Sequence, residues 1–172
     1  MPGQGYHLGI MKLVADKTGR KVSSQLVTGT LIVDALNAPF GGRRRTHFAG
    51  GGACVLPTYT ELRNYVPQSM DSGFKPSFLV DPITDMRAFE ATSIHVNEGD
   101  YKDGIRIHLL TDRGYDQLVH NKLFDFKNQK DDIVVVRATN EQIDGKTFRQ
   151  GLYASYPFLD NYLMHKAGIT SE

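Results

Sequence analysis

The chain alternates short apolar runs with glycine from one end to the other. Seventeen of its 172 residues are glycine, and many of the apolar runs between them contain β-branched residues. Such runs are typical of strands, because branched side chains pack well on a pleated surface. The sequence therefore predicts a β-rich α+β domain built on a mostly antiparallel or barrel-like sheet.

Particular segments fit this interpretation. Residues 7–15 and 25–33 flank a turn-like stretch at 16–19, which predicts a hairpin. Residues 133–136 are apolar on both faces, as expected of an inner strand. Asp144-Gly145 has the composition of a tight hairpin turn. Further strands are predicted at residues 78–80, 88–96 and 104–110.

One or two short helices complete the prediction. Thr111 or Asp112 can cap a helix in which Tyr115, Leu118 and Val119 recur at helical spacing, and we expect that face to pack on the sheet. Near the C-terminus, residues 157–167 precede Gly168 and predict a helix with a glycine cap.

Length and charge limit the class of protein. A chain of 172 residues predicts a single domain over residues 1–172. Twenty basic residues nearly balance nineteen acidic ones, so binding to nucleic acid is not expected. There is no basic, apolar leader at the N-terminus and no apolar run of about 20 residues, so we expect synthesis in the cytoplasm and no contact with a membrane.

Residues 92–119 hold the candidate catalytic site. This block contains His95 and His108 with several acidic residues, among them Asp103, and we take these three as candidate catalytic residues. If the predicted strands pair, the two histidines could approach each other and, with Asp100 or Asp103, form a metal set. Their spacing matches no standard zinc signature, however, so neither a metal nor another cofactor is expected.

A basic, glycine-rich segment is the candidate interaction site. Arg43, Arg44 and Arg45 lie within residues 41–52, among several glycines. Arginine offers planar, multi-donor contacts to carboxylates, so the segment suits a neighbouring subunit or another partner, although a solvated loop explains it equally well. Cys54 follows closely and is expected to be a buried apolar residue without a disulfide partner.

Several motifs together are similar to a family of phage- and prophage-encoded proteins of unknown function. They are V-T-G-T-L-I-V-D-A, G-G-A-C-V-L-P-T-Y-T-E-L, S-I-H-V-N-E-G-D-Y-K-D-G-I and L-L-T-D-R-G-Y-D-Q-L. That family's Ile-His and Gly-Cys block in turn resembles the catalytic signature of L,D-transpeptidases. In this correspondence Ile94-His95 matches Ile-His, Gly104 matches the glycine, and Ile105 replaces the cysteine nucleophile. The segment Leu56-Pro57-Thr58-Tyr59 also lacks the family's turn glycine.

The resemblance implies a transpeptidase-like scaffold without its nucleophile. Two functions follow as expectations. The first is a non-enzymatic structural or interaction protein of a virion, assembling with itself or with other virion proteins. The second is a cell-wall-processing enzyme that uses His95 with nearby acidic residues or a metal.

Overall fold

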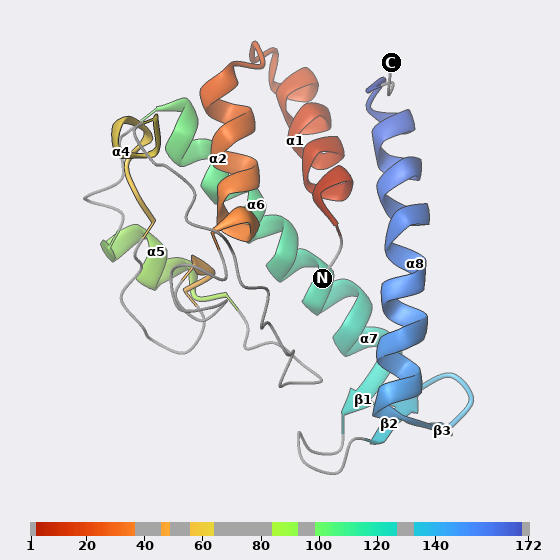
Figure 1. Cartoon of the computed structure of the whole chain (residues 1–172). Helices are drawn as coiled ribbons and strands as arrows, with labels where there is room; N and C mark the ends of the chain where they lie inside the picture. Colours follow the sequence, from red (N-terminus) through yellow and green to blue (C-terminus); the bar gives the residue numbers. More distant parts are fainter. Residues whose placement is uncertain are drawn as a thin grey trace.

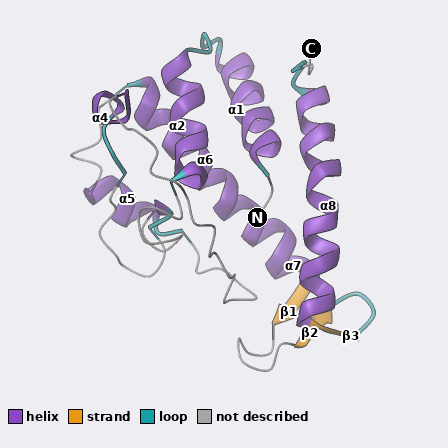
Figure 2. Cartoon of the chain, in the orientation of Figure 1, coloured by secondary structure: helices purple, strands orange, loops and turns teal. Residues whose placement is uncertain are grey.

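Helices, and not strands, dominate the structure. The structure is a computed structural model and describes residues 3–36, 46–48, 56–63, 84–92, 99–126 and 133–169. This part of the chain is 72% helical and 10% strand, so the predicted β-rich class is wrong (Figure 2). Long helices lie along one another. A small sheet lies at the lower end of the C-terminal helix, next to the short helix that ends at Leu123 (Figure 1). Glycine and β-branched residues misled the prediction because their preference for strands is weak and tertiary packing overrides it.

The predicted N-terminal hairpin is a pair of helices. α1 (Gln4–Thr18) and α2 (Ser24–Ala35) replace the two strands. In α1 the buried His7, Met11 and Ala15 recur every fourth residue, which is a helical and not a strand period. Gly19 has a φ of 67° and its N–H binds the Asp16 carbonyl, so this glycine ends a helix and does not turn a hairpin.

α2 crosses α6 (Asp100–Tyr115) at a contact between two glycines. A Cβ on Gly29 would lie 2.0 Å from the Tyr101 carbonyl oxygen, and a Cβ on Gly104 would lie 2.3 Å from the Leu26 carbonyl oxygen. Only residues without a side chain permit this approach of two backbones. The strand predicted at residues 104–110 is therefore part of a helix. Gly104, which was matched to a transpeptidase motif, lies where this helix crosses α2.

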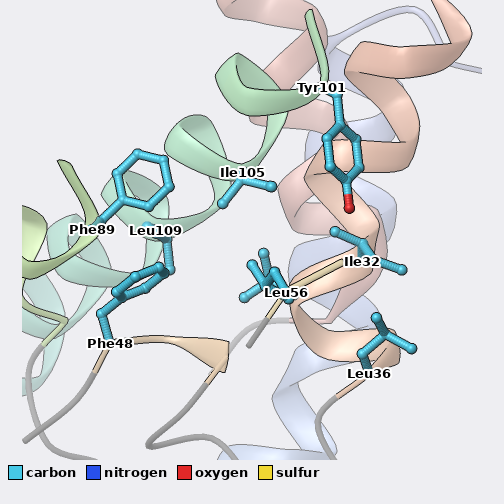
Figure 3. Packing of buried hydrophobic residues seen from close by; sticks show 9 residues of the cluster. Ile32, Leu36, Phe48, Leu56, Phe89, Tyr101, Ile105 and Leu109 are labelled. Carbon is cyan, nitrogen blue, oxygen red and sulfur yellow. The ribbon is translucent and has the colours of Figure 1, made fainter. Parts of the chain in front are cut away.

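The main apolar core lies beside this crossing. Ile105 and Leu109 of α6 are fully buried against aromatic and aliphatic side chains from four other segments (Figure 3). The rings of Phe48 and Phe89 meet edge to face, with their centroids 5.2 Å apart. Burial of each large side chain contributes about 1.5–3 kcal/mol. The cluster consists of Ile32, Val33, Leu36, Phe48, Leu56, Phe89, Tyr101, Ile105 and Leu109.

Two short helices close the core. α4 (Tyr59–Arg63) begins with a capping box, in which the Thr58 hydroxyl accepts from the Glu61 N–H and the Glu61 carboxylate accepts from the Thr58 N–H. α5 (Met86–Thr92) occupies part of the predicted strand 88–96 and is therefore a further correction. The main-chain N–H of Asp85 donates to the Phe48 carbonyl at 3.2 Å, which joins the start of α5 to the segment that contains His47.

The helix predicted after Thr111 is real but starts earlier. α6 begins at Asp100, and it continues through a π-helical turn, η2 (Asp116–His120), into α7 (Asn121–Leu123). Of the predicted apolar face, Tyr115 is buried, whereas Leu118 is 63% exposed. The prediction that this face packs on a sheet was wrong, because α6 packs chiefly on α2.

In the part of the chain that the structure describes, the sheet has three antiparallel strands in the order β1-β2-β3. They are β1 (Phe124–Phe126), β2 (Ile133–Val136) and β3 (Glu141–Asp144). The prediction of an inner strand at 133–136 is confirmed, because β2 pairs with both neighbours. Val134 of the central strand and Phe148 of the helix that follows the sheet are buried against each other, and they form a second small core.

α8 (Gly145–Lys166) is longer than the predicted C-terminal helix. Asp144 caps its first turn through the N–H groups of Lys146 and Thr147, so Asp144-Gly145 starts a helix and does not form the predicted hairpin turn. Gly168 has a φ of 67° just beyond the helix, which confirms the predicted glycine cap. α8 returns along the molecule and packs against α1 (Figure 1).

Among the described residues, no helix is both long enough and apolar enough to cross a membrane.

Candidate metal centre

A cluster of three histidines and two aspartates lies where α1, α2 and α6 meet the segment 46–48. We call it the His/Asp cluster, and it consists of His7, Asp34, His47, His108 and Asp112. His108 and Asp112 are one helical turn apart on α6, so their side chains share a face. The glycine crossing of α2 and α6 brings Asp34, near the end of α2, to the same place.

The ring nitrogens of two histidines lie close to one oxygen of each carboxylate. His47 Nε2 lies 3.1 Å from Asp34 Oδ1 and 3.4 Å from Asp112 Oδ2. His108 Nε2 lies 3.3 Å from Asp112 Oδ2 and 3.3 Å from His47 Nε2. Ligand atoms about 2.1 Å from a tetrahedral zinc ion stand about 3.4 Å apart. His47, His108 and Asp112 therefore have the spacing of ligands to one ion, and Asp34 lies beside them with its Oδ1 3.8 Å from His108 Nε2.

His7 faces the other oxygen of each carboxylate. Its Nε2 lies 3.3 Å from Asp112 Oδ1 and 4.0 Å from Asp34 Oδ2. Its ring stacks on that of His108, with the centroids 3.8 Å apart. Each carboxylate thus contacts His7 through one oxygen and His47 and His108 through the other, and His7, Asp34 and His108 form a second set of three possible ligands.

The histidine rings are oriented by hydrogen bonds outside the cluster. His108 Nδ1 lies 2.8 Å from the Thr30 carbonyl oxygen, which can only accept, so Nδ1 carries a proton. In the neutral ring Nε2 then presents its lone pair to the cluster. His47 Nδ1 binds the Thr46 hydroxyl at 2.8 Å. Metal-binding histidines commonly have this arrangement, with the second ring nitrogen bonded to a carbonyl or another polar group.

Burial and charge act against each other on the two central groups. Burial alone would raise the pKa of the Asp34 carboxyl, but the hydrogen bond from His47 and the charges of His108, His47 and His7 hold it below its ordinary value. Burial alone would lower the pKa of His108, but the hydrogen bond and charge of Asp112, together with Asp34, raise it. Four members of the cluster, all except Asp34, are almost fully buried, so strong interactions are required to keep these groups charged.

Of the three residues predicted to be catalytic, the structure brings one into the cluster. His108 lies at its centre. Asp103 lies five residues earlier on α6, about 140° around the helix from His108, and its carboxylate pairs with Arg20 and Arg106 at the surface. Asp100 is likewise bound by Arg20 and Ser23. His95, Cys54 and the three arginines Arg43, Arg44 and Arg45 lie outside the described residues.

Sequence reasoning missed the other four members of the cluster. Asp112 carried a usable signal, because His108 and Asp112 have the helical ligand spacing i, i+4 once residues 104–115 are read as a helix. His7, Asp34 and His47 are far from each other in sequence and follow no standard motif. Their association depends on how the helices pack.

Comparison with known proteins provides no relative, since no protein-family model, curated protein or solved structure matches this chain. The resemblance to phage proteins and to L,D-transpeptidases is therefore still only a prediction. The site has to be interpreted from its own geometry.

An open pocket with two arginines is lined by residues close in sequence to members of the cluster. Thr84, Asp85, Arg87 and Arg113 line it. Arg113 directly follows Asp112, and Asp85 is bonded to Phe48, which directly follows His47. The Asp85 carboxylate accepts from the N–H groups of Arg87 and Ala88 at the start of α5. Within the described part of the chain neither guanidinium forms an ion pair, so the pocket presents two cations beside the Asp85 carboxylate.

Proposed function

We propose that this protein is a metal-dependent hydrolase that binds a divalent transition-metal ion such as zinc in the His/Asp cluster and acts on phosphate esters. The observation that carries the proposal is the convergence of three imidazoles and two carboxylates, whose donor atoms lie 3.1–4.0 Å from their neighbours in the cluster. Imidazole with carboxylate is a ligand set that suits zinc and related ions.

The orientation of the rings suits a cation once the imidazoles are neutral. The Thr30 carbonyl holds the His108 proton on Nδ1, and Nε2 then faces His47 Nε2 and two carboxylates. In the neutral ring that nitrogen has only a lone pair to offer. A cation at this point satisfies the lone pairs and both negative charges at once, and removes the repulsion between them.

The chemistry follows from this position. These residues would hold a divalent ion, which when bound would supply a nucleophile for hydrolysis by lowering the pKa of a water molecule. The two negative charges of Asp34 and Asp112 balance the charge of a divalent ion. The Thr30 carbonyl fixes the orientation of the His108 ring. Burial of the cluster strengthens each of these interactions, because water does not screen them.

The basic pocket supports the substrate class. Arg87 and Arg113 can each donate two parallel hydrogen bonds to the oxygens of a phosphate group. Arg113 directly follows the proposed ligand Asp112 on α6. A neutral ester would gain nothing from two guanidinium groups.

The first experiment measures metal. The protein is purified without a metal-affinity tag, its bound metal is quantified, and its affinity for added Zn²⁺ is determined by competition with a chromogenic chelator. We expect about one or two equivalents of metal, and a large loss of affinity in Asp112→Ala. A wild-type protein that binds no divalent ion would instead show that the cluster is a hydrogen-bonded His–Asp network, and would reject the proposal.

The second experiment tests the substrate class. The loaded protein is assayed with p-nitrophenyl phosphate, bis(p-nitrophenyl) phosphate and p-nitrophenyl acetate. We expect turnover of a phosphate ester that chelators abolish, no comparable turnover of the acetate, and a raised KM in Arg113→Met. Turnover of the acetate alone would be consistent with a metal-dependent hydrolase but would reject phosphate esters as its substrates.

The expectation of a non-enzymatic virion protein stays a prediction. It rested on the resemblance with its missing nucleophile, on the near-neutral charge, and on the arginine segment 41–52, most of which lies outside the described residues. Nothing in the described part of the chain favours it over the metal centre.

A further inference from the structure

The helix that carries His7 has no cap of its own. Gly3 stands at the N-cap position of α1 and offers no side chain, and the first turn contains no acidic residue. The first N–H groups of a helix have no partner within the helix, and the helix dipole places positive charge there. Helices usually satisfy both needs with a side chain of the same segment.

In this protein α8 supplies the missing group. Asp160 Oδ1 accepts from the N–H of Tyr6 at 3.0 Å, and Asp160 Oδ2 accepts from the N–H of Gly5 at 3.3 Å. The two residues are separated from Asp160 by more than 150 positions in the sequence. A carboxylate from the last helix therefore caps the first helix, directly before His7.

The glycines of α1 permit this contact. A Cβ on Gly3 would lie 2.2 Å from Asp160 Oδ2, and a Cβ on Gly5 would lie 2.8 Å from the Cβ of Asp160. One turn further on, a Cβ on Gly9 would lie 2.8 Å from the Cβ of Leu163. The three glycines thus face α8 and let its side chains reach the backbone of α1.

We infer that Asp160 is a positioning residue for His7, so that α8 holds one side of the metal centre in place without touching it. The inference rests on the proposed metal centre. His7 follows the two capped residues, and its own N–H binds the Gly3 carbonyl. Its ring must meet Asp112 Oδ1, which is 3.3 Å away, and stack on His108. A first turn that frays would release the ring from both contacts.

Asp144 provides a matched control. Like Asp160 it is an aspartate that caps a helix through two main-chain N–H groups, here those of Lys146 and Thr147, each at 3.0 Å. It caps α8 itself, at the end remote from α1 (Figure 1). Asp144→Ala and Asp160→Ala therefore each remove one cap, but only Asp160→Ala affects the turn that holds His7.

The test is a double-mutant cycle in metal affinity. Zn²⁺ affinity and stoichiometry are measured for the wild type, His7→Ala, Asp160→Ala, the double variant and Asp144→Ala. We expect Asp160→Ala to weaken binding about tenfold or more, as loss of an outer-shell partner typically does. In the His7→Ala background the same change should have no further effect, and Asp144→Ala should bind like the wild type.

Two further measurements separate positioning from loss of fold. Asp160→Asn retains an oxygen that can accept one N–H, so it should recover part of the lost affinity. The visible absorption of bound Co²⁺ should change in Asp160→Ala as it does in His7→Ala, while far-ultraviolet circular dichroism stays that of the folded protein.

The outcomes distinguish this inference from the proposed function. If the wild type binds no metal, the metal centre itself fails. If it binds metal and His7→Ala weakens binding while Asp160→Ala does not, the centre stands and the positioning role is rejected. Equal losses from Asp160→Ala in the presence and absence of His7 would likewise reject it.

Discussion

The Nδ1 atom of His108 lies 2.8 Å from the main-chain oxygen of Thr30, on the helix that crosses α6. This bond joins the packing of two helices to the orientation of one imidazole ring. It forms only because Gly29 and Gly104 let the backbones of α2 and α6 approach so closely. The geometry of the metal centre is therefore sensitive to a contact that contains no metal ligand.

Replacement of Gly104 by alanine should damage both stability and metal binding. The added Cβ would meet the Leu26 carbonyl at 2.3 Å, so the helices must separate. We expect a loss of about 1–3 kcal/mol in the free energy of unfolding and weaker binding of Zn²⁺. Gly114→Ala is the control in the same helix: a Cβ there meets nothing within 4 Å, and we expect a gain of about 0.5–1 kcal/mol from helix propensity. Urea unfolding and metal titration of both variants check the prediction, and equal behaviour of the two would contradict it.

A histidine inside the cluster and a histidine outside it should differ sharply in their effect on metal binding. His47 contributes Nε2 to the cluster, whereas His120 is also buried but pairs with Asp116 at 3.2 Å and lies eight residues beyond Asp112. We expect His47→Ala to reduce Zn²⁺ affinity by more than about 100-fold, because loss of a metal ligand weakens binding more than loss of a group that only orients a ligand. His120→Ala should leave the affinity within about threefold of the wild type. Isothermal titration measures both, and a comparable loss in His120→Ala would place the centre elsewhere.

The metal-free protein should be most stable in a mildly acidic window. The pKa of Asp34 is lowered from 3.8, so its contribution is present above about pH 4 and is lost as pH falls below that value towards the folded pKa. The pKa of His108 is raised from 6.5, so its contribution is present below about pH 6.5 and is lost as pH rises through the folded pKa. Urea unfolding in the presence of a chelator, from pH 3 to 9, should show stability declining on both sides of this window.

Added Zn²⁺ should make the protein more stable, and not less, as the pH rises above the acidic window. Zn²⁺ binds neutral imidazole and so competes with protons, which makes binding tighter as the histidines lose theirs. At a free-ion concentration of about 1,000 times Kd, the added stability is about 4.1 kcal/mol. A pH profile that is the same with and without Zn²⁺ would contradict the assignment of the cluster as a metal centre.

Asp103→Asn should leave metal binding unchanged, although the sequence made Asp103 a catalytic candidate. Its carboxylate pairs with Arg20 and Arg106 on the outer side of α6, where the side chain is 31% exposed. Partly exposed ion pairs contribute about 0–1 kcal/mol each, and less at high salt. We expect a loss of stability within that range at low ionic strength and unaltered Zn²⁺ affinity. A fall in metal affinity to the level of His47→Ala would restore the original prediction.

Local patterns were interpreted correctly at two places. The apolar run 133–136 is the central strand β2, and Gly168 ends a helix in the left-handed conformation. They failed where the same residue serves two uses. Gly19 and Gly145 could equally turn a hairpin or bound a helix, and the β-branched run in residues 27–33 could equally form a strand or a buried helix face.

The sequence by itself determined the chemistry that is present: the six histidines, the aspartates and His108 within a block that suggested an active site. It also contained the four-residue spacing of His108 and Asp112, which has meaning only on a helix. Tertiary structure alone decided which groups meet. His7, Asp34 and His47 come from segments far apart in the chain, and they converge because glycines without side chains let α2 pack against α6 and α1 against α8. No local rule contains that information, because close packing is a property of pairs of helices and not of either one.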